Sequence, residues 1–342
     1  MTLWLWVGFV VFVLAMLAFD LFVVNRKAHE ISVRNSLLWT GLTIATALAF
    51  AGVVYYVYSA GVMPFREGAN QPTTAREAVT MYLTAWILEY ALSLDNLFVF
   101  VIVFRTFGVP KALQHRVLFW GILGVMVFRG VMIGAGAALV HEFEWVIYVL
   151  GGVLLLTAIK LATAGEETVH PEKNPMIRLT RRVVPVTHGY DGDRFFSRVT
   201  AADGVLRRAV TPLFLVLLVI ETTDVVFAVD SIPAAFGVTA DPFLVFTSNV
   251  FAIIGLRSLF FAVAAVIDKF HYLKVSLVFV LGFIGLKMTM SWLVKVPPEV
   301  SLGVVVAVLV GGIVASVLWP KATDASGHEV VLPPEGGGRP PE

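Results

Sequence analysis

Long apolar runs separated by short polar stretches dominate the sequence. A helix needs about 20 apolar residues to cross a bilayer, and nine runs reach or approach that length. The predicted spans are residues 3–24, 37–59, 79–104, 117–140, 145–163, 211–231, 243–267, 275–293 and 300–319. The pattern therefore predicts an all-α, polytopic membrane protein with about nine transmembrane helices.

The composition agrees with this interpretation. Hydrophobic residues make up 58% of the chain and charged residues 14%, whereas soluble domains average about 45–50% apolar and about 25% charged residues. The formal net charge of +1 argues against nucleic acid as a partner. The chain has no cysteine and no HExxH, P-loop or GxSxG motif, so we expect neither an enzyme nor a resident cofactor.

Basic residues mark alternate loops of the nine-span arrangement. Lysine and arginine gather in the first, third, fifth and seventh loops, whereas the even-numbered loops are neutral or acidic. Because an excess of these residues marks the cytoplasmic side, the pattern predicts an N-terminus outside the cell and a cytoplasmic C-terminus. An odd number of spans also places the two termini on opposite sides of the membrane, so the loop charges and the span count agree.

Two three-span units of opposite orientation are predicted within the chain. Each unit begins with an acid-bearing span, continues with a central arginine (Arg129, Arg257) and ends with a lysine (Lys160, Lys287). Because three is odd, the copies would be inverted across the bilayer, as in many secondary transporters. The predicted regions are a two-span extension (1–78), a first repeat (79–163), an Arg-rich cytoplasmic linker (164–209), a second repeat (210–294), a last span (295–319) and a disordered tail (320–342).

Acids inside two of the apolar runs are the candidate chemistry. Each ionised group at membrane depth costs roughly 2.5–3.5 kcal/mol on insertion scales, so groups that are retained there are functional by default. The candidate ligands are these acids and one neighbouring amide: Glu89, Asp95, Asn96, Glu221, Asp224 and Asp230. Oxygen donors without thiol or imidazole favour a hard cation such as Mn²⁺, Ca²⁺ or Mg²⁺. Protons would compete for the same oxygens.

Helical spacing groups some of these acids and separates others. Glu221 and Asp224 are three residues apart and share a helix face. Asp230 lies six residues beyond Asp224, roughly 240° around an ideal helix. It would converge with the others only if the helices cross closely or the backbone unwinds, and Pro233 predicts that the helix ends nearby.

Internal ion pairing is the alternative role for the same acids. The two arginines and two lysines of the repeat offer four positive charges in the membrane, and buried pairs would only hold the bundle together. The linker also has two interpretations. Its bases either set the topology or form a regulatory, anionic-lipid surface.

Two long motifs give the chain a resemblance to a known family. The first reads Glu-Tyr-Ala-Leu-Ser-Leu-Asp-Asn-Leu-Phe-Val-Phe from Glu89, and the second Glu-Thr-Thr-Asp-Val-Val-Phe-Ala-Val-Asp-Ser-Ile-Pro-Ala from Glu221. With Asn249-Val250-Phe251-Ala252, they resemble the TerC family of integral membrane proteins, named for tellurium resistance and including the Alx branch. The resemblance extends over the nine spans and fails only in the linker and the tail.

The resemblance implies a bacterial inner-membrane protein related to the lysine-exporter superfamily, whose bacterial members are linked to manganese efflux. The acidic motif positions that it carries over are the six candidate ligands. Tellurite itself is an implausible substrate, because an acidic site repels an oxyanion. We therefore predict export of Mn²⁺ or another hard divalent cation, driven by proton exchange or membrane potential. The alternative is a membrane scaffold or stress-response protein with structural acids.

Overall fold

The computed structural model describes residues 2–19, 33–66, 68, 70–143, 145–163, 174–187, 189–200, 206–263 and 272–319. The predicted tail and Asp20 lie outside these residues. The described chain forms ten helices and two strands: α1 (Thr2–Phe19), α2 (Val33–Ser59), α3 (Ala75–Thr106), α4 (Lys111–Glu142), α5 (Val146–Thr163), α6 (Pro175–Val183), β1 (Phe196–Thr200), β2 (Leu206–Val210), α7 (Pro212–Val238), α8 (Pro242–Val263), α9 (Leu273–Thr289) and α10 (Pro298–Leu318).

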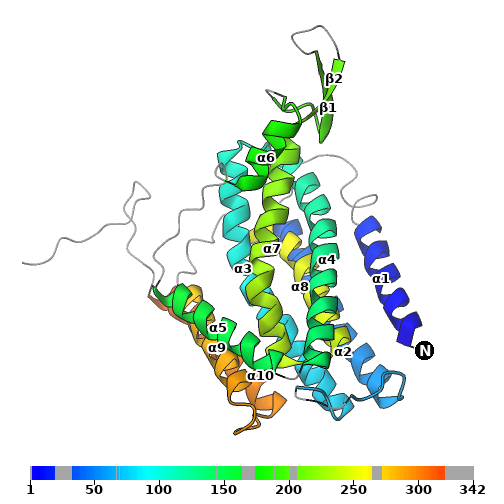
Figure 1. The fold of residues 1–342 in the computed structure, drawn as a ribbon, viewed down its shortest axis with the longest axis vertical. Helices are drawn as coiled ribbons and strands as arrows, with labels where there is room; N and C mark the ends of the chain where they lie inside the picture. The colour runs from blue at the N-terminus through cyan, green and yellow to red at the C-terminus, as the bar shows by residue number, and fades with distance from the viewer. Residues whose placement is uncertain are drawn as a thin grey trace, which may run out of the picture.

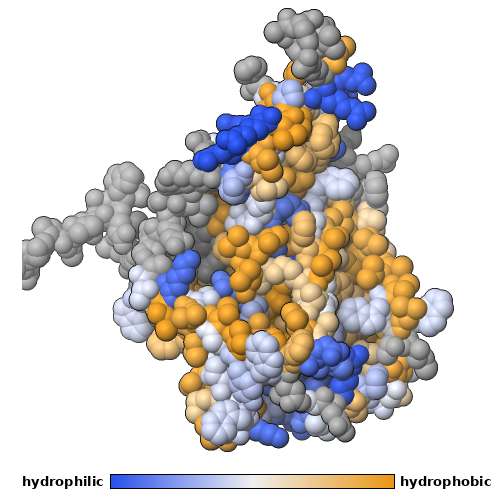
Figure 2. All heavy atoms as spheres, viewed as in Figure 1, coloured by the Kyte–Doolittle hydropathy of each residue, from blue (hydrophilic) through white to orange (hydrophobic). Residues whose placement is uncertain are grey.

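Six helices of the described chain are long and apolar enough to cross a bilayer, namely α2, α3, α4, α5, α7 and α10. Two shorter apolar stretches lie in α1 and α8. Hydrophobic side chains cover the middle of the face shown in Figure 2, and hydrophilic ones gather toward its ends. The protein is therefore a multi-pass, mainly helical membrane protein, as the sequence predicts. The total of nine spans stays a prediction.

Helix α3 is the most deeply packed of the six candidate spans. It contacts α2, α7, α8 and α10, and 62% of its most apolar window is buried, against 22–44% for the others. The hydroxyl of the N-cap Thr74 accepts from the amide of Glu77, and the carboxylate of Glu77 accepts from the amide of Thr73, an arrangement close to a capping box. Gly108 adopts φ 61° just past the last turn, a conformation that glycine tolerates. Local sequence thus fixes both ends of the central helix.

Close helix pairs depend on glycines at two places. A Cβ at Gly151 of α5 would lie 3.1 Å from the carbonyl oxygen of Gly285 in α9, and one at Gly285 would lie 3.0 Å from that of Gly151. The backbones of α5 and α9 can touch because neither residue has a side chain. On α4, Gly121 and Gly124 instead face side chains of α7, those of Ile220 and Glu221. These contacts position α4 and α7 for the site described below.

Helix α7 does not end near Pro233, contrary to the sequence-based expectation. The helix continues through this proline to Val238. Proline removes one backbone hydrogen bond, but residues 231–240 are all buried, and packing from neighbouring helices sustains such interruptions in membrane proteins. The backbone therefore does not unwind to bring Asp230 toward Asp224.

The linker contains secondary structure that the sequence analysis did not predict. Helix α6 and the antiparallel hairpin β1–β2 lie at one end of the bundle (Figure 1). Tyr190 donates a 2.7 Å hydrogen bond to the carbonyl of Phe107, and burial raises the pKa of its phenol, so the hydroxyl remains a donor. Arg116 also pairs with Asp193. The linker is thus docked on the α3–α4 connection, and the fold is not purely helical.

The end of the bundle opposite the linker holds the N-terminus and two of the connections. The N-terminus lies at the end opposite the linker (Figure 1). At that opposite end, the backbone amide of Ala240 bonds to the carbonyl of Asn70 at 2.9 Å. This bond joins the α2–α3 connection to the α7–α8 connection. Elsewhere in the bundle, the backbone amide of Tyr272 bonds to Ser316 near the end of α10. The last helix therefore ends beside the start of α9.

Candidate functional site

A buried arginine in α4 joins acids from two other helices. The guanidinium of Arg129 donates two hydrogen bonds of 2.9 Å to the two carboxylate oxygens of Asp224 in α7. Its other terminal nitrogen pairs with the carboxylate of Glu89 in α3 and lies 3.3 Å from the amide oxygen of Asn249 in α8. Four helices therefore meet at one side chain.

This cluster lies near the middle of its helices. With a rise of ~1.5 Å per residue, Arg129 is ~27 Å from the start of α4 and ~20 Å from its end. Asp224 is ~18 Å from the start of α7 and ~21 Å from its end by the same rise. The sequence analysis expected a site at this depth.

The charges of the cluster do not balance. Glu89 and Arg129 are each 2% exposed and Asp224 4%, and two carboxylates share one guanidinium, for a net charge of −1 when all are ionised. Within the described structure, Oε2 of Glu89 and Nδ2 of Asn249 have no hydrogen-bond partner. Buried groups with spare charge and unmade hydrogen bonds destabilise a fold. This arrangement among the described residues makes the cluster a candidate functional site.

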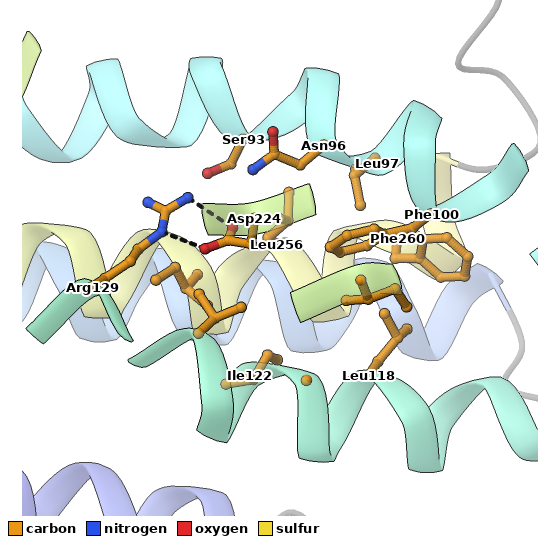
Figure 3. A pocket seen from close by; sticks show the side chains of 14 residues that line it. Ser93, Asn96, Leu97, Phe100, Leu118, Ile122, Arg129, Asp224, Leu256 and Phe260 are labelled. Atoms are coloured by element: carbon orange, nitrogen blue, oxygen red, sulfur yellow. Dashed lines mark hydrogen bonds and ion pairs between the residues drawn. The ribbon is translucent and has the colours of Figure 1, made fainter. Parts of the chain in front are cut away.

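A small cavity adjoins the cluster. Its interior measures about 20 Å³, room for about one water molecule or one bare ion. Its polar end is lined by Ser93, Asn96, Arg129 and Asp224 (Figure 3). Phe100 and Phe260 lie at the other end (Figure 3), where the lining is apolar. Polar side chains thus face a space of ionic size, with an aromatic boundary toward the linker end of the bundle.

Glu221 lies close to this cluster but is held differently. Its carboxylate packs against the backbone of Gly124 in α4, in space that a Cβ would fill. One of its oxygens, Oε2, is buried without a partner within the described structure. Glu221 and Asp224 face α4 together, as their three-residue spacing predicts. They do so because α4 places a glycine opposite one acid and an arginine opposite the other.

Three other predicted residues, Asp230, Lys287 and Lys160, do not join this cluster. Asp230 accepts a 2.8 Å hydrogen bond from Thr157 of α5, on a different side of α7. Lys287 donates to Ser301 of α10 at 3.2 Å, and Lys160 is exposed in the last turn of α5. The side chains of Asp95 and Arg257 lie outside the described residues. Of the expected supporting charges whose side chains are described, Arg129 is therefore the one that joins the cluster.

The oxygens near Arg129 fit a hard cation only as a mixed set. Among the described residues, no three or more His, Asp or Glu side chains gather closely enough to hold a metal together. Ser93 and Asn96 line the same cavity as Asp224, and hydroxyl and amide oxygens are ligands that hard cations accept. Metal binding by the six predicted residues stays a prediction.

Sequence analysis missed two polar residues of the site, Ser93 and Asn249. Both are buried, at 1% exposure, and each carries an atom without a hydrogen-bond partner in the described structure. Asn249 lies inside a predicted apolar span, where an uncharged amide is also costly. Counting amides and hydroxyls together with acids would have identified it.

Comparisons with known proteins place this arrangement in a family. The sequence profile described as "Integral membrane protein TerC family" matches residues 74–324. An uncharacterized membrane protein of Myxococcus xanthus is 45% identical over 322 residues, covering 94% of each chain. The "putative membrane-bound redox modulator Alx" of Salmonella typhi is 42% identical over 306 residues, covering 89% of this chain and 91% of that one. No solved structure matches significantly. The resemblance seen in the two acidic motifs is thus confirmed, and the chain belongs to the TerC family of integral membrane proteins.

Proposed function

We propose that this protein is a membrane transporter that exports a hard divalent cation, with Mn²⁺ as the first candidate and Ca²⁺ as the second. The observation that carries the proposal is the buried Glu89–Arg129–Asp224 cluster beside a cavity of ionic size. Intramembrane ionisable groups that face the inside of a bundle mark ion and proton pathways. The proposal agrees with membership of an integral membrane family.

The charges near the cavity support a divalent cargo. Glu89, Glu221 and Asp224 carry three negative charges when ionised and Arg129 one positive charge, so the four side chains sum to −2. One divalent cation or two protons would neutralise them. Exchange of a cation for protons at the same oxygens therefore avoids an uncompensated charge in low dielectric.

Arg129 acts in this proposal as the resident counter-charge of the two acids. A guanidinium is permanently charged and binds a carboxylate at two points, so it neutralises Asp224 whenever no cation does. An arriving divalent cation would compete with the guanidinium for the oxygens of Glu89 and Asp224. The cation and the guanidinium of Arg129 then bind these carboxylate oxygens in turn. The return of the guanidinium assists release of the cation.

We infer an orientation with the linker end of the bundle in the cytoplasm of a bacterial cell and the N-terminus outside the inner membrane. The Arg-rich linker and the start of α4 lie at one end of the molecule, and the N-terminus at the other (Figure 1). The positive-inside rule assigns the basic end to the cytoplasm. The cavity then extends from the acids toward the cytoplasmic side, which suits a cargo that is loaded there.

We also infer the inverted repeat of α3–α4–α5 and α7–α8–α9. A two-fold axis that relates the two units would exchange α3 with α7, α4 with α8 and α5 with α9. It would therefore relate a contact between α3 and α8 to a contact between α7 and α4. Both contacts are present, and α5 also packs on α9. Such an axis would pass near the Arg129 cluster, where α3 meets α7, and sites at the repeat interface are common in secondary transporters.

The second candidate function is a membrane scaffold or stress-response protein, and the relatives' printed name of redox modulator belongs with it. This chain has no cysteine, so it offers no thiol for disulfide exchange. A redox effect would therefore be indirect, for example through the cellular level of a redox-active metal. In the scaffold alternative, the acids near Arg129 are structural and the protein moves no ion.

Uptake of Mn²⁺ into inverted membrane vesicles tests the proposed function. We expect uptake by the parent protein, competition by Ca²⁺ that ranks the two cations, and loss of uptake in Glu89→Gln and Asp224→Asn at unchanged protein level. Glu142→Gln is the control, because that acid is exposed at the far end of α4. Equal flux in parent, site variants and protein-free vesicles would favour the scaffold.

A further inference from the structure

Helix α6 presents an apolar face and a basic face side by side. At ~100° per residue, Met176, Leu179 and Val183 fall within an arc of ~60°, and the three arginines fall within a separate arc of ~100°. All of these side chains are exposed: Met176, Leu179, Val183, Arg178, Arg181 and Arg182. A short helix with these two faces is the pattern of segments that lie in the headgroup region of a membrane.

The helix is held against α7 by a third side. Ile177 is buried, at 2% exposure. The side chain of Asn174 caps α6 by accepting from the amide of Met176 and donates a 2.8 Å hydrogen bond to the hydroxyl of Thr222. The orientation of the two exposed faces is therefore fixed by contacts inside the protein.

Contacts at the two ends of α6 give its depth. Thr222 lies in α7 and bonds to Asn174, the residue just before α6. It is ~15 Å along α7 from Pro212. Just past the end of α6, Val186 pairs with Val210, two residues before α7 begins. Helix α6 therefore runs back along the first half of α7 toward the start of that helix. If α7 spans the bilayer, this position would put the apolar face of α6 at acyl-chain depth and its last two arginines toward the headgroups.

The arginines of α6 differ from other basic residues near the linker. Arg116 pairs with Asp193 and Arg194 with Asp191, whereas the described residues supply no acid to Arg178, Arg181 or Arg182. Three positive charges with no acidic partner among the described residues, beside exposed Met176 and Leu179, complement a molecule with an anionic head and a hydrocarbon tail.

We propose that α6 is a binding site for an anionic phospholipid of the cytoplasmic leaflet. The lipid phosphate binds the basic face through charge-assisted hydrogen bonds, and the acyl chains lie along Met176 and Leu179. The leaflet follows from the orientation proposed above, but the binding itself is independent of cation transport. A protein partner for the same face is an outcome that the experiment below separates.

The test uses the full chain, purified in a nonionic detergent, with phosphatidylglycerol as the anionic probe and phosphatidylcholine as the neutral one. Native mass spectrometry counts retained lipids over a titration series. We expect preferential retention of phosphatidylglycerol by the parent and about 30-fold weaker retention in the double variant Arg178→Gln with Arg182→Gln. Glycerol phosphate, which lacks acyl chains, is expected to compete poorly.

A matched control removes the same charge from the hairpin. Arg198 and Arg208 face each other across β1 and β2. These strands lie beyond α6 from the bundle (Figure 1), so Arg198→Gln with Arg208→Gln should retain the lipid like the parent. Equal loss in both double variants, or equal retention of the two lipids by the parent, would overturn the proposal. Strong competition by glycerol phosphate would identify a phosphate or phosphoprotein site and would also overturn it. Mn²⁺ uptake is not a readout, so failure here leaves the transport proposal intact.

Discussion

Arg129 and Asp224 form a two-point ion pair between α4 and α7, with both hydrogen bonds at 2.9 Å and both side chains almost fully buried. The pair is not self-sufficient, because the same guanidinium also binds Glu89. A fold that needed only a buried pair would require one acid. The second acid is the feature that turns a structural contact into a candidate cation site.

Arg129→Gln leaves two buried acids without their counter-charge. We expect a loss of about 3–5 kcal/mol in the free energy of unfolding, measured as a lower midpoint of thermal unfolding in detergent. Added Mn²⁺ should recover much of this loss, because the cation takes over the role of the guanidinium. Arg129→Lys keeps the charge but not the two-point contact, so it should be intermediate. If Mn²⁺ raised the midpoints of parent and Arg129→Gln equally, Arg129 and the cation would not share their oxygens.

Gly124→Ala places a methyl group where the carboxylate of Glu221 lies. We expect Mn²⁺ uptake to fall several-fold, and stability to fall by about 1–3 kcal/mol because of overpacking. Gly134→Ala on the same helix is the control, since its Cβ would meet nothing within 4 Å. Normal uptake in Gly124→Ala would show that the position of Glu221 is unimportant to transport.

Asp230 and Asp224 belong to one motif but lie in different surroundings. Asp230→Asn keeps an oxygen that can accept the hydroxyl of Thr157, so we expect this variant to retain most of the Mn²⁺ uptake. Asp224→Asn removes the charge that Arg129 binds, and we expect it to be inactive. The two variants are compared in the same vesicles at matched protein level. Inactivity of both would return Asp230 to the cation pathway as a residue outside the cluster.

Tyr58 and Asp241 form a buried hydrogen bond of 2.7 Å between α2 and the start of α8. Asp241 also accepts from the amides of Phe243 and Leu244. Tyr58→Phe should therefore lower the free energy of unfolding by about 1.5–3 kcal/mol, the usual range for a hydrogen bond to a charged group. Tyr56→Phe is the control, because Tyr56 is 68% exposed. Equal midpoints for the two variants would show that this contact does not stabilise the fold.

The sequence predicts the membrane class, the buried acids and the pairing of Glu221 with Asp224, because hydropathy and helical spacing are local properties. It also predicts the family from the two acidic motifs. It does not predict that Arg129 binds Glu89 and Asp224 together, because that depends on how three helices pack. Asn249 was missed for a different reason, because only the acids within the apolar spans, and an amide next to one of them, were counted as candidates.

Tertiary context overrode one expectation and ordered a region for which the sequence predicted no secondary structure. Pro233 is a helix-ending signal in isolation, but complete burial of the surrounding turn keeps α7 helical. The linker is polar and Arg-rich, and its composition suggests a plain connection. Side-chain contacts with α7 and with the α3–α4 connection order α6 and the hairpin instead.

The position of bound Mn²⁺ tests the central claim most directly, through anomalous diffraction from crystals of the full chain grown with Mn²⁺. We predict a single strong peak between Glu89 and Asp224, facing Ser93 and Asn96, with the guanidinium of Arg129 moved off at least one of the acids. A peak elsewhere in the membrane region, with Arg129 still bound to both acids, would contradict the account.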